Sequence, residues 1–430
     1  MSEPMYTSGY QPGQSNPIAT PDQLALEQLA VKLARRPEVR RARENARAML
    51  LADVEATTPD GAAGLDRALD QWVMGQIAAT INADPSRPRL FWSVDNTPRS
   101  WFGQVFPGAA VAIDNPDNVN RVAPLDGAWS YRLEGRFGHP PTAQMSIQIT
   151  LADNGQLRWG DAIGTLVNRD IVTDEQGRFT VTLDTSPANG RANHIQLRKG
   201  PLQMAIRDSH GDWGQQATAY TLHVVGGPEL LPPPSEDALV DEVASGMEDF
   251  VKFWLGFKNN FWDYPDPNQT IGPFKRVREG GWGTQAGGRF AIADDQALVI
   301  TTESGGSEYT GFQVSDPWTI SPTPIHRTTS RNINQAKANP DGSYTYVVSH
   351  VDPGVANWID TDGLREGWFM LRWQNLGQNA EVETLVRDTR LVTLDTLPSV
   401  LPDGCPKVTL DERREEIQRR MALHRRRTAG

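Results

Sequence analysis

Residues 145–151, Met-Ser-Ile-Gln-Ile-Thr-Leu, alternate between apolar and polar side chains at every position. Successive side chains of a β-strand point to opposite faces, so this period of two predicts a strand with one buried face. Asp153-Asn154-Gly155 follows, and such a sequence is typical of a tight hairpin turn. The segment therefore indicates an antiparallel sheet, in which short turns can join neighbouring strands.

The same alternation recurs on both sides of this strand. It is found at Trp129, Tyr131 and Leu133, at Phe179, Val181 and Leu183, and at Tyr220, Leu222 and Val224. Short strands at this spacing predict an antiparallel sandwich or barrel. A second β region is expected from 274 to 392, with candidate strands at 297–302, 344–350, 367–373 and 382–386.

Helical patterns flank the two β regions. Thr20-Pro21-Asp22 caps a first helix, which Pro37 interrupts before it continues to about residue 54, and another helix is predicted over 62–81. After a proline-rich linker, Ser235 caps a helix with an apolar stripe that we interpret as core: Leu239, Val243, Met247, Phe250 and Trp254. A capping box of Thr409 and Glu412 predicts a last helix, with its apolar residues facing inward: Ile417 and Met421.

The chain has 430 residues, too many for a single hydrophobic core of ordinary size. Its patterns divide it into an arm expected to be disordered (1–19), a helical cap (20–107), a first β region (108–226), a linker with a bridging helix (227–260), a second β region (261–400) and a C-terminal helix (401–430). The predicted fold class is α+β, with two antiparallel β regions, sandwich-like or jelly-roll-like, bridged by a helix.

The charge of the chain limits the partners that it can have. A formal net charge of −11 argues against nucleic-acid binding, because such a surface needs an excess of Lys and Arg. Two arginine-rich stretches, 35–47 and 413–427, are interleaved with glutamate, and we interpret them as solvated helix faces. No apolar run is long enough to span a membrane, and residues 1–20 lack a secretion signal. We expect a cytoplasmic protein with a small-molecule ligand or substrate and with no nucleic-acid or membrane partner. The sequence leaves open whether the protein forms a homo-oligomer.

The usual catalytic and cofactor motifs are missing from the sequence. It contains no nucleotide-binding glycine loop, no nucleophile elbow and no HExxH zinc motif. Its single cysteine, Cys405, excludes an internal disulfide, and no pair among the seven histidines has the short spacing of a metal site. We therefore expect neither a metal nor a cofactor.

A first candidate site lies in the polar segment that begins at Ile113. Asp114 and Asp117 offer a pair of carboxylates at the mouth of the predicted sandwich, with Asn115 and Arg121 as groups that could bind a ligand. The alternative is purely structural, because Asn and Asp also stabilise turns through their own side chains. In that interpretation Arg121 ties the turn.

A second candidate site follows the strand that is predicted to end at His350. Asp352, Asn357, Trp358 and Asp360 come together after a Pro-Gly turn. A sugar ring could stack on an exposed indole while its hydroxyls bind Asp and Asn, and paired carboxylates could act as acid and base. A folded turn around a buried tryptophan would explain the same residues.

Several short motifs carry a resemblance to a known family. They are Val314-Ser315-Asp316-Pro317-Trp318, Arg331-Asn332, Asn339-Pro340-Asp341-Gly342-Ser343-Tyr344 and the segments 352–360 and 367–373. Together they resemble a bacterial family catalogued as domain of unknown function 1214, and the similarity extends over roughly 100–400. The resemblance implies a β-sandwich, jelly-roll-like fold. A glycosidase-like role has been suggested for relatives on structural grounds, but the family supplies no established catalytic residues that could be transferred to this chain.

Two functions are compatible with these observations. The first is an enzyme that acts on a small hydroxylated or glycosidic molecule, with Asp114, Asp117, Asp352 and Asp360 supplying acid and base. The second is a non-catalytic binding or assembly protein, which would use its 13 tryptophans to hold a steroid-like or terpenoid-like ligand or a partner subunit.

Overall fold

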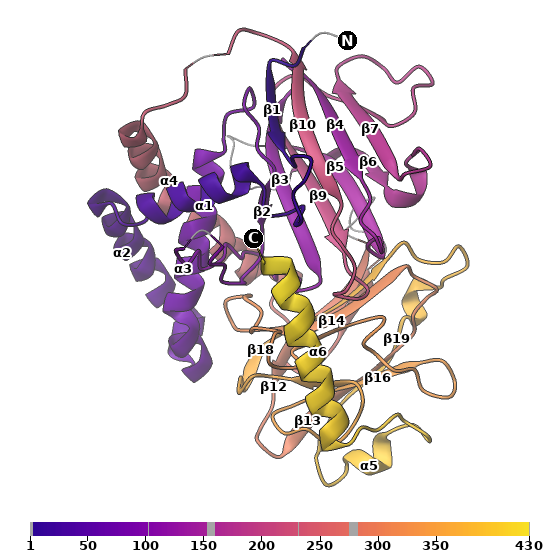
Figure 1. Cartoon of the computed structure of the whole chain (residues 1–430). Coiled ribbons are helices and arrows are strands. Elements are labelled where there is room, and N and C mark those ends of the chain that lie inside the picture. The colour runs from indigo at the N-terminus through magenta and orange to yellow at the C-terminus, as the bar shows by residue number, and fades with distance from the viewer. Residues whose placement is uncertain (1–2, 102, 153–159, 231, 275–282, 430) are drawn as a thin grey trace.

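The computed structural model of the chain describes residues 3–101, 103–152, 160–230, 232–274 and 283–429. Its α-helices are α1 (Pro21–Leu33), α2 (Pro37–Leu51), α3 (Pro59–Ile81), α4 (Glu236–Asn260), α5 (Leu397–Val400) and α6 (Leu410–Thr428). Helices α1 to α4 group on one side of two β units, and α6 lies across both units (Figure 1). The predicted α+β class, with helices before the β regions and a helix after them, is confirmed.

The first β unit consists of two facing sheets with the strand orders β1-β10-β4-β7-β8 and β2-β3-β9-β5-β6. Its strands are β1 (Tyr6–Gly9), β2 (Phe91–Ser93), β3 (Asn118–Asp126), β4 (Ser130–Arg136), β5 (Gln144–Leu151), β6 (Ala162–Val167), β7 (Arg178–Asp184), β8 (His194–Gln196), β9 (Pro201–Ser209) and β10 (Ala219–Gly226). Apolar residues of both sheets, such as Leu133 and Met204, form one core between them.

Strand β5 contains the alternating stretch from which the sheet was predicted. Met145, Ile147 and Ile149 lie in the core between the two sheets, so the period of two is confirmed. The polar side chains of β5 are buried as well, which the sequence did not predict. The reason is that Gln148 shares its face of the sheet with Phe91, and that face packs on the helices. The predicted hairpin turn at 153–155 lies outside the described residues.

The second β unit also consists of two sheets, with the strand orders β11-β12-β18-β14-β15 and β17-β16-β13-β19. Its strands are β11 (Ile271–Phe274), β12 (Thr284–Ala291), β13 (Gln296–Thr302), β14 (Tyr309–Ser315), β15 (Ser330–Asn332), β16 (Tyr344–Ser349), β17 (Trp358–Asp360), β18 (Glu366–Gln374) and β19 (Val386–Thr393). The strand predicted at 382–386 is wrong: Val382–Thr384 form a 3₁₀ turn that buries Leu385, and β19 begins only at Val386.

The helical layer confirms the apolar stripe predicted for α4. Val243, Met247, Phe250 and Trp254 are buried in one core with residues of α1, α2 and α3. Trp318, from the loop after β14, lies in the same core and connects the helices to the second β unit. Within the described residues, no helix has both the length and the hydropathy that are needed to cross a membrane.

The N-terminal arm differs from its prediction. Tyr6–Gly9 form the edge strand β1, which pairs antiparallel with β10. Thr7 also bonds through its hydroxyl to the His223 ring at 2.8 Å. The expected disorder is wrong for Tyr6–Gly9, because the polar composition of this segment did not reveal the edge of β10 with which it pairs.

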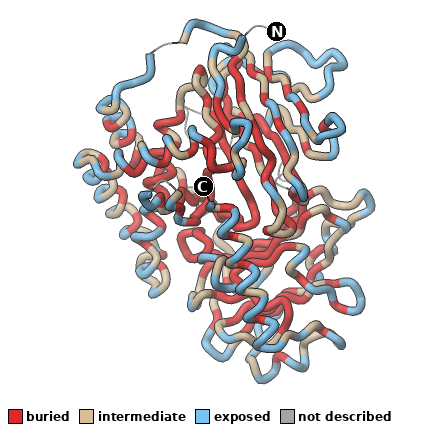
Figure 2. The backbone as a smooth tube through the Cα atoms, in the orientation of Figure 1, coloured by how far each residue is buried: buried red, intermediate tan, exposed pale blue. Residues whose placement is uncertain are grey.

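Helix α6 has the predicted capping box but not the predicted inner face. Thr409 and Glu412 exchange both capping hydrogen bonds. The most buried side chains of the helix are Arg413, Arg420, His424 and Arg427, whereas the expected apolar pair is only half-buried. Figure 2 shows much of the two β units in the red of buried residues, with α6 lying across them. The interpretation of 413–427 as a solvated face is therefore wrong for the arginines at every seventh position, which share one side of the helix.

Candidate functional site

A cavity of about 150 Å³ lies between the two β units. One wall comes from the first unit, through Asn118 and Asn120 of β3 and Arg207 of β9. The opposite wall comes from the second unit and from the end of α4. The lining is completed by Val94, Ala112, Ile113, Asp114, Asn115, Phe257, Phe261, Gln285, Met370 and Arg372.

The cavity has a buried polar inner wall and a half-exposed rim. The polar side chains of the inner wall are each more than nine-tenths buried, and they are Asp114, Asn115, Asn118 and Arg372. The rim consists of Asn120, Arg207, Phe257, Phe261 and Gln285, which are partly exposed. An apolar pocket with a few convergent polar groups is the usual form of a small-molecule site.

The backbone of the cavity wall is strained. Val94, Ala112 and Ile113 have φ angles of 56°, 55° and 49°, in the left-handed region that favours glycine. Such a conformation is unusual for a β-branched residue and costs of the order of 1–3 kcal/mol at each position. All three residues line the cavity. Strain of this kind persists where the surrounding structure holds it, and it concentrates at binding sites.

Two side chains of the second β unit hold this strained segment. Arg372 donates from Nη2 to the carbonyl of Ile113 at 2.9 Å, and Gln313 donates to the carbonyl of Asp114. Arg372 also donates from Nη1 to Oε1 of Gln313 at 2.5 Å. Burial lowers the pKa of Arg372, and the negative charge of Asp114 opposes this.

Asp114 is the only one of the four predicted catalytic carboxylates that lines the cavity. Its Oδ1 accepts the backbone N–H of Ser321 at 2.8 Å, and its Oδ2 accepts the Ser321 hydroxyl at 2.5 Å. Burial raises the pKa of Asp114 to about 6, even though both hydrogen bonds act in the opposite direction. The group therefore changes its charge close to neutral pH, as acid/base groups often do.

The other residues of the first predicted site have structural partners. Asp117 accepts from Trp213 Nε1 at 2.7 Å, from Asn332 Nδ2 at 3.0 Å and from the Tyr309 hydroxyl at 2.8 Å. It is buried and does not line the cavity. Asn115 donates to Tyr309 at 2.9 Å and accepts the N–H of Asp117, so it both stabilises the turn and reaches the cavity.

Arg121 does not tie the turn in the way that the structural alternative supposed. It lies on β3, forms an ion pair with Asp208 and donates to the carbonyl of Thr218 at 2.8 Å. Its guanidinium also lies over the Tyr220 ring, 4.6 Å from the ring centre. These contacts place Arg121 inside the first β unit, away from the cavity lining.

The second predicted site does not reach the cavity. Trp358 is 8% exposed, and its indole donates to the carbonyl of Ser349 at 3.0 Å, so the expectation of an exposed stacking platform is wrong. Asn357 is buried and donates to the carbonyls of Lys337 and Thr345 at 2.8 and 3.2 Å. The alternative of a folded turn around a buried tryptophan describes this segment.

The two aspartates of the second site are held by ion pairs, and its histidine by a hydroxyl. Asp352 pairs with Arg413 of α6 at 2.9 Å, and Asp360 pairs with Arg327 at 3.0 Å. His350 bonds through Nδ1 to the Thr361 hydroxyl at 2.8 Å. None of these three residues lines the cavity that Asp114 lines.

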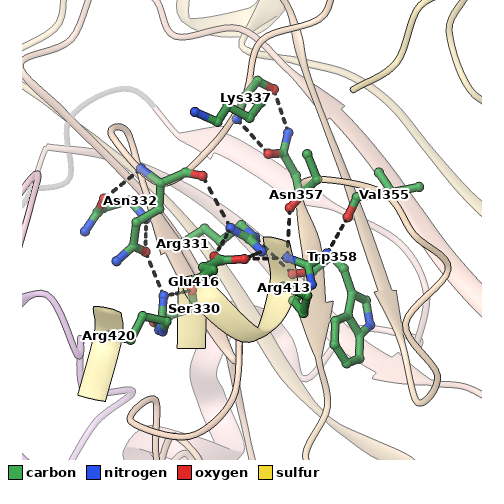
Figure 3. A network of polar contacts seen from close by, with 12 residues as sticks. Ser330, Arg331, Asn332, Lys337, Val355, Asn357, Trp358, Arg413, Glu416 and Arg420 are labelled. Carbon is green, nitrogen blue, oxygen red and sulfur yellow. Dashed lines mark hydrogen bonds and ion pairs between the residues drawn. The ribbon is translucent and has the colours of Figure 1, made fainter. Parts of the chain in front are cut away.

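A polar network connects α6 to the second β unit (Figure 3). Glu416 accepts from Arg331 at 2.6 Å and from Arg413 at 2.6 Å. Arg331 in turn donates to the carbonyl of Trp358 at 3.0 Å, and Arg420 donates to the carbonyl of Ser330 at 3.1 Å. The same helix contacts the first unit, since Arg427 donates to the carbonyl of Pro116 at 2.8 Å.

Sequence reasoning missed Arg372 and Asn118. One signal was available for each. Arg372 is a charged residue inside the otherwise apolar run Phe369–Trp373, and Asn118 and Asn120 occur at the period of two that places side chains on one face of a strand. Among the described residues, no group of three or more His, Cys, Asp or Glu side chains has the arrangement of a metal site.

Comparisons with known proteins found a family model that matches part of the chain, and similar solved structures. Residues 314–375 match the family model described as Protein of unknown function (DUF1214), which confirms the resemblance predicted from the sequence. A search of curated proteins found no match. The crystal structure of an uncharacterised protein from Burkholderia cenocepacia is similar, with a TM-score of 0.68, 20% identity and coverage of 87% of this chain and 99% of that one. The VPA0106 protein from Vibrio parahaemolyticus aligns with a TM-score of 0.41 and 10% identity over 76% of this chain and 99% of that one.

Proposed function

We propose that this protein binds a small hydroxylated molecule in the cavity between its two β units. The proposal rests on the inner wall of the cavity, where Asp114, Asn115, Asn118 and Arg372 line a space of about 150 Å³. Apolar side chains such as Ile113 and Met370 complete the wall. This combination suits a ligand that has both hydrogen-bonding groups and a short hydrocarbon part.

The size of the cavity supports a small ligand. A dry cavity of about 150 Å³ in another protein holds one benzene molecule. A steroid-like or terpenoid-like ligand is much larger, and it would bury the polar inner wall without giving it hydrogen-bond partners, which is costly. We therefore favour a small polar ligand over the hydrophobic one. Assembly with a partner subunit stays an alternative, which light scattering of the purified protein tests.

A screen for ligand binding tests the proposal. Thermal shift and saturation-transfer NMR would be measured against polyols, hydroxy acids and short sugars. Asn118→Leu, which replaces the amide by an apolar group with the same number of heavy atoms, should abolish the binding that wild type shows. Asn379→Leu, at an exposed position, is the matched control and should leave it intact. Binding that survives Asn118→Leu, or a panel without any binder, would contradict the proposal.

Asp114 favours a second candidate function, in which the bound molecule is also converted. A carboxyl group with a pKa of about 6 can both donate and accept a proton near neutral pH, which suits general acid/base catalysis. Of the four predicted carboxylates we retain only Asp114 for this role, because the others are bonded away from the cavity. Mass spectrometry of each incubated mixture detects conversion. Asp114→Asn should then lower turnover by roughly 10²–10⁴-fold while binding persists, and an unchanged rate would exclude the role.

A further inference from the structure

Arg372 is a buried cation without a direct counter-ion. Its exposed fraction is 7%, and its two terminal nitrogens donate to neutral acceptors, the Gln313 amide and the carbonyl of Ile113. In the described part of the chain, no carboxylate lies within ion-pair distance of it; Asp114, which lines the same cavity, and Asp117 act on its charge only from further away. A buried charge is normally paired, because desolvation without a partner is costly.

Most of the other buried arginines in the described part of the chain follow the usual rule. Four of them pair with carboxylates: Arg99 with Glu27, Arg121 with Asp208, Arg331 with Glu416 and Arg413 with Asp352. Arg420 and Arg427 also lack an ion pair among the described residues, but they belong to the buried face of α6 and do not line the cavity. Arg372 therefore combines two properties, the lack of a carboxylate at ion-pair distance and a position on the wall of the cavity.

The rest of the inner wall indicates which other chemical groups a ligand that binds Arg372 would carry. Oδ1 of Asn118 is buried and has no hydrogen-bond partner within the described structure, so it can accept from a hydroxyl after a small side-chain adjustment. The wall also contains the apolar side chains of Val94, Ile113 and Met370. Arginine matches the geometry of a carboxylate through two parallel N–H donors, although here its terminal nitrogens already have one bond each.

We infer that the ligand of the proposed site is a small hydroxylated carboxylate, whose negative group pairs with Arg372 and whose hydroxyl donates to Asn118. This inference rests on the proposed function and adds the chemical class of the ligand. It fits the volume, since a hydroxy acid with a short branched chain is only slightly larger than benzene. The branched chain would pack against the apolar part of the wall.

The test compares matched probes on the wild-type protein. The probes are 2-hydroxy-3-methylbutanoate, its primary amide and 3-methylbutanoate, which lacks the hydroxyl, and their dissociation constants would be measured by NMR titration. The acid should bind at least about tenfold more tightly than the amide, because charge-assisted hydrogen bonds are stronger than neutral ones. Removal of the hydroxyl should weaken binding several-fold. Arg372→Gln should abolish the preference for the acid, and Arg390→Gln, at a surface ion pair, should not.

The outcomes separate the inference from the proposed function. If the amide binds as well as the acid, or better, the cavity is a ligand site but the inference is wrong. If none of the probes and no member of the wider panel binds, both fail. The comparison of acid with amide needs only the wild-type chain, so it decides the inference even if Arg372→Gln does not fold.

Discussion

Asp316 offers a sharp test of the electrostatics beside the cavity. Its Oδ1 accepts the backbone N–H groups of Trp318 and Ile320 at 3.0 and 2.9 Å, whereas its buried Oδ2 has no hydrogen-bond partner within the described structure. The nearest cation is Arg67, at 3.7 Å and half-exposed. Burial raises the pKa of Asp316 to about 7, and Arg67 opposes the shift. The perturbation is Asp316→Asn, which keeps the acceptor oxygen but cannot ionise.

The magnitude follows from the change in pKa between the unfolded and folded states. A rise from 3.8 to about 7 is about 3 units, and each unit corresponds to about 1.4 kcal/mol, so the largest effect is about 4 kcal/mol. Because the folded-state pKa is raised, the wild type has this stability below pH 4 and loses it progressively as the pH rises towards 7. The new amide N–H lacks an acceptor at every pH. We therefore expect Asp316→Asn to have nearly the same free energy of unfolding as wild type, or a slightly lower one, at pH 4.5. At pH 8.5 the free energy of unfolding of the variant, relative to wild type, should be about 2–4 kcal/mol higher than at pH 4.5.

Urea unfolding at the two pH values measures this difference. Asp388→Asn is the control, because Asp388 lies on an exposed strand in an ion pair with Arg390, and its effect should change by less than about 0.5 kcal/mol between the two conditions. Asp114 raises the pKa of Asp316 through its negative charge, so Asp114→Asn should reduce the pH dependence. An Asp316→Asn effect that is the same at both pH values would refute the reasoning.

Two further predictions concern stability and use urea unfolding with matched pairs. Arg420→Met should destabilise the protein by roughly 2–4 kcal/mol, because it leaves the carbonyls of Pro324 and Ser330 without their donor. Arg414→Met, on the exposed face of α6, should change stability by less than about 0.5 kcal/mol. Equal effects of the two substitutions would contradict the buried role of Arg420. Gly256→Ala should stabilise α4 by about 0.5–1 kcal/mol, since the new Cβ meets open space. In Gly61→Ala the Cβ would lie 1.9 Å from the carbonyl oxygen of Glu55, so we expect a loss of at least 1–3 kcal/mol, and a neutral result would show that this turn relaxes.

Much of the fold could be predicted because it depends on local patterns. The period of two in β5, the apolar stripe of α4 and the capping box of α6 each depend on neighbouring residues, and each is present in the structure. The predictions were wrong where the structure of a segment depends on a partner that is distant in the sequence. Strand β1 forms because β10 has a free edge more than 200 residues away in sequence, and no pattern within 1–19 contains that information.

The candidate site was predicted less well, for a related reason. Asp and Asn serve equally in turns and in binding sites, so residue types alone could not distinguish Asp114, on the cavity wall, from Asp117, which Trp213 and Asn332 hold. The segment 350–360 was interpreted as a site because its partner in α6, Arg413, lies 61 residues further along the chain than Asp352. The role of Arg372 depends on Ile113 and Gln313, which are 259 and 59 residues away in sequence.

The position of α6 has a consequence for how a ligand would reach the cavity. The helix is fastened to the second β unit through Arg413 and Arg420 and to the first through Arg427. A hinge motion that parted the units would break these buried contacts and expose the carbonyls that they satisfy, which makes wide opening rare. We propose that access depends instead on rotation of Phe257 and Phe261, which line the cavity and are partly exposed, because side-chain rotation is far faster than domain opening. We expect exchange of a small ligand to be limited by these two rings, and replacement of either ring by alanine to speed association and release together.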